Sequence, residues 1–403
     1  MKHMLLFVGI FLVFAGTSVA SLSIGEMQIL FNSGMDDVET GEPERFKSAI
    51  EKFEAIRDDY LTLPRIRLEL GNAYYLNEQG FSAGREFEEA LALDLDDEIS
   101  AEIRAGIEKY IDAYTRPKLD VEVGVKVMHN DNVTAGPSDD LVTLWGIDGW
   151  RLGSEGRKKS DNALLTSIGI SYVVPMDDAI SWFTSFNFDS TNYSSLEDHD
   201  FQLARLYTGL AVKAGEVSLQ FPLTADYSLY KGDPYAANIG ANPRATIDLG
   251  EGFSLSVLAM VSKRDCPFLW ARTGLVYGGG LSLRKDFGKG LVAFGGYQRL
   301  REDTKLASYS ADVDFFYARF VKTWGDFSVN FSPSFSRREC DESLPYLTEP
   351  REDKRLTLPA GIEYAVTDGL SFVAEYVHIK NESSSDIYGH DQHKVIGGVI
   401  FRF

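Results

Sequence analysis

The last ten residues of the chain alternate strictly between two sets, and this pattern constrains the fold more than any other feature. One set consists of Val395, Gly397, Val399, Phe401 and Phe403, and the other of Lys394, Ile396, Gly398, Ile400 and Arg402. Successive side chains of a strand point to opposite faces, so one face of this strand is built of Val and Phe. A wall with lipid outside and a lumen inside has this character. The chain is expected to end in a strand of a membrane β-barrel, with a terminal barrel signal at Gly398, Phe401 and Phe403.

The same period of two recurs back to about residue 118. It predicts about fourteen strands, an even number as bacterial barrels have, at residues 118–128, 162–174, 179–189, 201–213, 216–230, 236–249, 253–263, 270–286, 290–300, 307–322, 326–337, 354–366, 369–380 and 392–403.

The links between these strands alternate in length, as expected when both ends of a barrel lie in the periplasm. The short links are rich in the Gly and Asp that turns favour, and they are residues 175–178, 214–215, 250–252, 287–289, 323–325 and 367–368. The long links are acidic and Ser-rich, and they include residues 190–200, 338–353 and 381–391. A soluble all-β protein has no reason to keep this order.

The amino terminus has the layout of a cleavable secretory signal. Lys2 precedes an apolar run from Leu5 to Phe14, and small residues end at Ala20. The run is shorter than the roughly 20 apolar residues that cross a bilayer. No later stretch has the length and hydrophobicity of a transmembrane helix, so strands are expected to make any crossing.

Residues 43–114 carry apolar side chains at helical spacing. Residues 34 positions apart match, as Ala49 with Ala83 and Phe53 with Phe87. This is the period of a tetratricopeptide repeat. The predicted packing positions of the second copy are Leu70, Gly71, Tyr74, Ala83, Phe87 and Ala90. Only the second helix of the first copy is expected, and residues 99–114 are expected to cap the stack.

Together these patterns predict an α+β multidomain chain. A signal peptide at residues 1–20 precedes a short α-helical, tetratricopeptide-like domain at residues 21–116, where Arg116-Pro117 ends the helices. A transmembrane antiparallel β-barrel follows at residues 117–403. Helix stacking explains the repeat by itself, and the additional hypothesis is a groove that binds polypeptide.

Composition and motifs exclude several functions. The 40 basic and 60 acidic residues give a net charge of −20, which disfavours nucleic acid as a partner. No nucleophile or carboxylate pair stands out, so we expect neither an enzyme nor a cofactor. His390 and His393 are spaced as metal ligands on a helix are, but they fall at a strand start, and no metal site is predicted. Lumen charges such as Asp226, Arg355 and Glu363 are interpreted as a hydrated barrel interior.

Two cysteines, Cys266 and Cys340, fall in predicted outer loops. An oxidising exterior permits a disulfide between them. The two loops are not neighbours along the barrel, so the sequence leaves the pairing open.

Two stretches carry a resemblance to a known family. One is Pro64 to Leu76, followed by Arg85-Glu86-Phe87-Glu88, and the other is His129 to Pro137, with Asn130, Asp131, Asn132 and Val133 at its centre. With the order of signal, short repeat domain and barrel, the chain resembles the surface lipoprotein assembly modifier family of Gram-negative outer-membrane proteins. It differs where Asn130 and Asp131 replace Asp-Ser, where Thr134 replaces Asn, and in its abbreviated helical domain.

The resemblance implies an outer-membrane translocator that delivers lipoprotein or secreted protein clients from the periplasm to the cell surface. The expected partners are outer-membrane lipid, the periplasmic protein client and the barrel assembly machinery, with the amino-terminal domain in the periplasm. Two alternatives stay open. An exopolysaccharide export porin also joins such repeats to a barrel, usually with more repeats, whereas a passive outer-membrane channel needs no helical domain.

Overall fold

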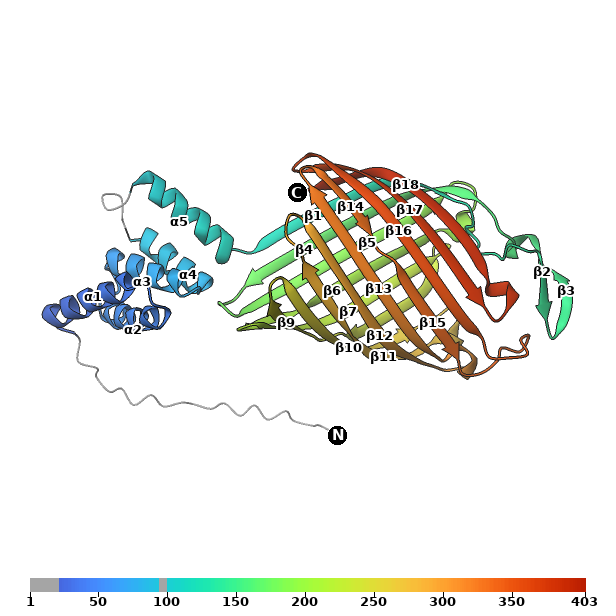
Figure 1. Ribbon diagram of the computed structural model, residues 1–403, viewed down its shortest axis with the longest axis horizontal. Coiled ribbons are helices and arrows are strands. Elements are labelled where there is room, and N and C mark those ends of the chain that lie inside the picture. The colour runs from blue at the N-terminus through green and yellow to red at the C-terminus, as the bar shows by residue number, and fades with distance from the viewer. Residues whose placement is uncertain (1–21, 94–99) are drawn as a thin grey trace, which may run out of the picture. The chain divides into compact units, whose positions relative to one another are not determined.

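The computed structural model describes residues 22–93 and 100–403, so the signal-peptide prediction for residues 1–20 lies outside the described part. The chain separates into two compact units between Thr115 and Arg116. The first is helical and the second is a barrel (Figure 1).

The helical unit has five helices: α1 (Ile24–Glu39), α2 (Pro43–Asp59), α3 (Pro64–Leu76), α4 (Gly80–Leu91) and α5 (Ala101–Tyr114). Local sequence sets where they begin. Ser23 and Glu26 form a capping box at α1, and proline opens α2 and α3, where the missing N–H costs nothing. Helix α1 corrects the expectation that the first copy keeps only its second helix, because α1 packs against α2 through Phe31 and Phe53.

The predicted packing positions lie where the helices of this unit pack against one another. Leu70, Ala83 and Ala90 have no exposed surface, and Tyr74 is buried. A Cβ on Gly71 would lie 2.5 Å from the Phe87 ring, so only glycine admits that ring without a shift. The first pair of helices repeats the arrangement, because a Cβ on Gly34 would lie 2.7 Å from the Phe53 ring.

The second unit is a closed antiparallel barrel, which confirms the predicted fold class. Its sheet has 16 segments, but two strands are each divided in two, so the wall consists of 14 strands. The undivided strands are β1 (Lys118–Asn130), β4 (Asp161–Pro175), β5 (Ile180–Tyr193), β6 (Phe201–Ala214), β7 (Val217–Tyr230), β10 (Phe253–Asp265), β11 (Gly274–Asp286), β12 (Leu291–Thr304), β13 (Ala311–Trp324), β16 (Glu352–Thr367), β17 (Leu370–Ser383) and β18 (His390–Arg402).

Proline divides the other two strands. Asn242-Pro243 separates β8 (Asp233–Ala241) from β9 (Arg244–Gly250), and Ser332-Pro333 separates β14 (Phe327–Phe331) from β15 (Ser334–Cys340). Proline has no N–H for the ladder. Its carbonyl still accepts, because the Ala259 and Ala318 amides donate to Pro243 and Pro333 at 3.0 and 2.9 Å.

The links differ from the predicted order in two places. Strands β7 and β8 are expected to have a longer link, but a two-residue turn joins them, with positive φ at Lys231 and Gly232 as in a tight hairpin. The link between β1 and β4 contains an unpredicted hairpin, β2 (Leu141–Leu144) and β3 (Ile147–Arg151), which stands outside the barrel wall (Figure 1).

The outer face of the barrel is apolar. Large side chains that alternate along the strands are exposed, among them Phe186, Phe221, Leu223, Phe316, Phe320, Phe372 and Val395. Such a band is what a transmembrane barrel turns toward lipid. None of the helices in the described residues has both the length and the apolar character needed to cross a membrane.

The cysteines do not pair. Both Cys266 and Cys340 are buried free thiols. Cys266 follows β10 and Cys340 ends β15, with β11, β12 and β13 between those two strands. Neighbouring strands lie about 4.8 Å apart, so this spacing far exceeds the Cα separation of a disulfide, at most about 7 Å.

Candidate functional site

The barrel closes where its first and last strands meet. Strand β1 pairs with β18 from Glu122 opposite Arg402 to Asn130 opposite Lys394. On its other edge β1 pairs with β4 along its whole length, from Lys118 to Asn130. The β1–β18 ladder, here called the seam, is therefore the shorter of the two, and side chains fasten both of its ends.

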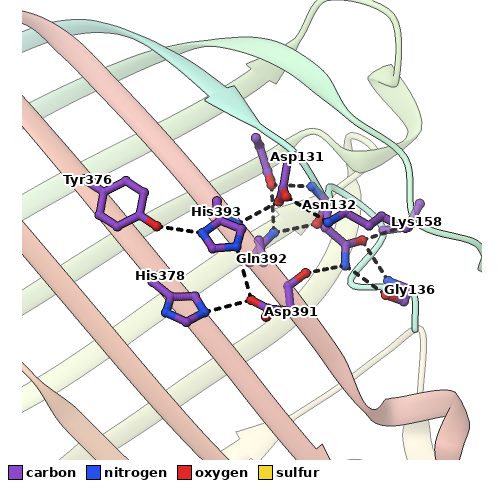
Figure 2. Close-up of polar contacts among 11 residues, drawn as sticks. Asp131, Asn132, Gly136, Lys158, Tyr376, His378, Asp391, Gln392 and His393 are labelled. Atoms are coloured by element: carbon purple, nitrogen blue, oxygen red, sulfur yellow. Dashed lines mark hydrogen bonds and ion pairs between the residues drawn. The ribbon is translucent and has the colours of Figure 1, made fainter. Parts of the chain in front are cut away.

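Two buried asparagines, Asn130 and Asn132, fasten the end of the seam that faces the long loops. Figure 2 shows Asn132 and its partners. The Asn132 side chain has no exposed surface, and its Nδ2 donates to the carbonyl oxygens of Gly136 and Asp391 at 2.8 and 2.9 Å. Its Oδ1 accepts from the Gly136 amide at 3.0 Å. One amide thus joins the chain leaving β1 to the first residues of β18, with its donors and acceptor satisfied as burial requires.

Asn130 and Gln392 complete this connection. Gln392 is buried at the start of β18, and its Nε2 donates to Asn130 Oδ1 at 3.0 Å and to the Asn132 carbonyl at 2.6 Å. Asn130 Nδ2 donates to the Tyr193 hydroxyl at 3.0 Å. We call Asn130, Asp131, Asn132 and Gln392 the clasp.

Asp131 is the charged member of the clasp. Its Oδ1 accepts from the His393 amide at 2.7 Å, and its Oδ2 pairs with Lys158 at 2.8 Å. Its own amide donates to the His393 carbonyl at 3.1 Å, which extends the ladder by one residue. Burial alone would raise the pKa of Asp131, but the His393 amide and Lys158 outweigh it, so the pKa lies below its usual value.

The clasp also holds the long loop between β1 and β4. The Val133 amide donates to the Lys159 carbonyl at 2.7 Å, and Thr134 Oγ1 donates to the Arg157 carbonyl at 2.6 Å. At Gly136 a Cβ would lie 2.6 Å from the backbone of Arg157, so the two passes of the loop touch there.

A second fastening lies at the end with the short turns. Arg402 Nε donates to Glu122 Oε2 at 3.1 Å, and its Nη1 donates to Glu363 Oε1 at 2.6 Å and Ser371 Oγ at 2.9 Å. Between the two ends, Gly398 lets the strands approach, since a Cβ there would lie 2.3 Å from the Val125 carbonyl oxygen. The terminal signal residues Phe401 and Phe403 point outward and are exposed.

Charged side chains line two cavities at opposite ends of the lumen, and arginines dominate one of them. Near the short turns, a cavity of about 400 Å³ is lined by residues that include Asp120, Glu122, Asn187 and Arg402. At the opposite end, a cavity of about 150 Å³ is lined by residues that include Arg264, Arg272, Arg338, Arg351 and Glu302.

The remaining predicted residues lie apart from one another. Asp226, which sequence analysis placed in the lumen, is partly buried and faces Arg205, which pairs with Asp189 at 2.5 Å. His390 and His393 do not meet as ligand partners, because residues three apart on a strand point to opposite faces of the sheet. His390 Nδ1 lies 3.0 Å from the carbonyl oxygen of Tyr388. His393 instead lies beside His378, which the sequence analysis did not single out.

The motif that carries the family resemblance therefore lies in the clasp, and sequence reasoning missed its partners. Gln392 and Asp391 are about 260 residues from Asn130 and Asn132 along the chain. Only the register of β18 against β1 brings them together, so no local spacing could have indicated them.

No protein-family model matches this chain, and no curated protein matches it. Solved outer-membrane barrels are similar in fold. A loop-deletion mutant of OmpT from Vibrio cholerae has 8% identity and a TM-score of 0.40, over 71% of this chain and 99% of that one. A FadL homologue from Pseudomonas aeruginosa has 10% identity and a TM-score of 0.39, over 71% and 89%. OmpF of Salmonella typhi, in complex with daunomycin, has 9% identity and a TM-score of 0.39, over 72% of this chain and 98% of that one. Identities and TM-scores this low transfer no function.

Proposed function

We propose that this chain is an outer-membrane translocator that delivers lipoprotein or secreted protein clients from the periplasm to the cell surface. The observation that carries the proposal is the clasp. Asn130 and Asn132 belong to the stretch that resembles the surface lipoprotein assembly modifier family, and their side chains connect to β18 where the first and last strands of the barrel pair.

The membrane setting follows from the barrel itself. A closed barrel satisfies every backbone group through its neighbours, and the exposed apolar side chains of its outer face would be costly in water. The chain enters β1 at the end with the short turns. We infer that this end and the helical unit lie in the periplasm.

Each part has a role in this proposal. The helical unit receives the client, and it leaves large apolar side chains such as Ile29, Leu61 and Ile103 exposed. The polar lumen accommodates an unfolded or hairpin segment but not a folded protein. The seam opens to let the client pass outward, with the clasp and the Arg402–Glu122 ion pair as its fastenings. Client folding outside or an accessory factor supplies the driving force, because the sequence has no nucleotide-binding loop.

The test is deletion of the gene in its host, followed by protease shaving and antibody labelling of intact cells. We expect at least one lipoprotein or secreted protein to disappear from the surface while its total amount is unchanged. The wild-type gene should restore display, and a gene without residues 21–115 should not, although its barrel reaches the membrane fraction. Unchanged surface display of every candidate client would contradict the proposal.

A passive channel is the second candidate, and the arginine-lined cavity favours it. Rings of arginine at the mouth of a pore select anions. Conductance in planar bilayers distinguishes the two functions. Anion-selective current that persists without residues 21–115, together with normal surface display in the deletion strain, would favour the channel.

A further inference from the structure

Two histidines and an aspartate meet on the outer face of the barrel beside the clasp (Figure 2). His378 lies on β17, directly opposite His393 on β18, and Asp391 lies two residues before His393. The Nε2 atoms of His378 and His393 lie 2.8 and 3.5 Å from Asp391 Oδ1. One potential ligand atom from each residue lies within 4.8 Å of the others.

These distances suit one metal ion. Zinc binds histidine nitrogen at about 2.0–2.1 Å and carboxylate oxygen at about 2.0–2.2 Å. Tetrahedral ligand atoms at those radii are about 3.4 Å apart, a value between the two observed separations. Two imidazoles and a carboxylate favour zinc and its neighbours over Mg²⁺ or Ca²⁺, which prefer oxygen ligands alone.

The surroundings hold the rings in place. The rings of His378 and His393 are stacked, with centroids 4.6 Å apart and planes within 6°. His393 Nδ1 lies 2.7 Å from the Tyr376 hydroxyl, and this contact orients the ring so that Nε2 faces Asp391. An outer partner on the non-ligating nitrogen is the usual companion of a metal-bound histidine.

The cluster is open to the outside solution. Along the outward row of β17, Phe372 and Tyr376 give way to His378, Lys380 and Glu382, so the cluster lies above the apolar band. The side chains of His378, His393 and Asp391 are 26%, 42% and 42% exposed.

Neighbouring charges do not block the cluster. Lys380, opposite Asp391 in the ladder, pairs with Glu382 at 2.7 Å. Lys158 pairs with Asp131 at 2.8 Å.

We propose that His378, Asp391 and His393 form a binding site for one divalent transition-metal ion of the zinc type. The ion bridges β17 and β18 at their outer ends and leaves a fourth position for water. Through the amide of His393, which donates to Asp131, it also steadies the clasp. The site does not depend on the proposed transport role.

The experiment measures zinc binding to the full chain, purified in detergent without a histidine tag, in the presence of excess Mg²⁺. We expect one zinc ion per chain from equilibrium dialysis. His378→Ala and His393→Ala should each weaken binding by more than about 100-fold, since even outer partners of a metal site are worth about 10–100-fold. Tyr376→Phe should weaken it by about tenfold. His390→Ala is the matched control and should bind as the wild type does.

Folding is checked by the migration of unheated samples on gels. Asp391→Asn is the second variant, since it keeps the backbone carbonyl that Asn132 uses and alters only the ligand. Cobalt substituted for zinc should give visible absorption bands that vanish in this variant. A folded wild type that binds no zinc at about 100 times the concentration of protein, or zinc binding that all three ligand variants retain, would overturn the proposal.

Discussion

Asn132 is the residue on which the closure at the outer end of the seam most depends. Asn132→Asp keeps the shape but replaces two N–H donors with an acceptor facing the carbonyls of Gly136 and Asp391. Buried groups left without partners cost about 1–3 kcal/mol each. We expect the free energy of unfolding to fall by at least about 2 kcal/mol, measured as the urea midpoint of the barrel in detergent.

The control for this change is Asn187→Asp, which alters an amide whose one side-chain bond is to Ser185. It should shift the midpoint little. Limited proteolysis should also cut the loop of residues 134–160 sooner in Asn132→Asp, because the clasp holds that loop. Equal midpoints and equal cleavage for the two variants would mean that the clasp contributes nothing to closure.

Among the elements, the seam strands offer a matched pair of glycines. A Cβ on Gly398 would lie 2.3 Å from the Val125 carbonyl oxygen, whereas one on Gly397 would lie 3.9 Å from its nearest neighbour. Gly398→Ala should therefore push β18 from β1 and lower the temperature at which the folded band converts on gels. Gly397→Ala should leave that temperature nearly unchanged, and an equal loss in both variants would contradict the close approach.

The first two helices are joined by a buried ion pair that makes them sensitive to acid. The hydrogen bond from Lys52 lowers the pKa of Asp37 on α1, and Arg45 adds a second contact. Because the pKa of Asp37 is lowered in the folded state, the ion pair stabilises the helices fully above the unfolded pKa of about 3.9. This stabilisation is lost as the pH falls through the folded pKa. Asp37→Asn should cost about 1–3 kcal/mol at pH 7 and progressively less below pH 4.

Thermal unfolding of the helices, followed by circular dichroism at each pH, measures this difference. Asp36→Asn changes the exposed neighbour on the same helix and is expected to follow the wild type at every pH. A penalty for Asp37→Asn that stays constant from pH 7 to pH 3 would show that the ion pair is not the source of the stability.

Strand and helix predictions succeed where the apolar period is long. The barrel strands were predictable because lipid and lumen impose a period of two over ten or more residues. Strands β2 and β3 are too short to show a period. The turn that joins them has positive φ at Trp145 and Gly146, and a Trp at such a position gives no turn signal in the sequence. The apolar period does not predict helix α1, although Ser23 and Glu26 form a capping box that marks its start.

At the scale of the whole molecule, the candidate site depends on contacts that no local pattern encodes. The resemblance indicated Asn130 to Val133, but not that these residues reach across to β18. The stacking of His378 on His393 likewise requires the register of β17 against β18. The clasp requires the pairing of β1 with β18, and the histidine pair requires the pairing of β17 with β18, so sequence periodicity predicts the wall but not the side chains that these registers bring together.

Opening of the seam can be tested by locking it. Val121 and Phe403 exchange both backbone hydrogen bonds, at 3.2 and 2.9 Å. Such pairs alternate with non-hydrogen-bonded pairs, so Met128 and Ile396 form one of the latter, with Cα atoms about 4.5 Å apart. That separation permits a disulfide. Met128→Cys with Ile396→Cys, in a background without Cys266 and Cys340, should stop surface delivery when oxidised and recover it on reduction.

A disulfide between two other neighbouring strands of the wall is the control. Thr184 and Thr208 face each other across β5 and β6 with hydroxyl oxygens 2.8 Å apart, and a loop already joins those strands. Oxidised Thr184→Cys with Thr208→Cys should therefore deliver clients normally. If the locked seam delivers as well as this control does, the client must travel through the lumen alone, and the seam is only a closure. If oxidation stops surface delivery in both variants, the disulfides act by stiffening the wall, and the result does not support opening between β1 and β18.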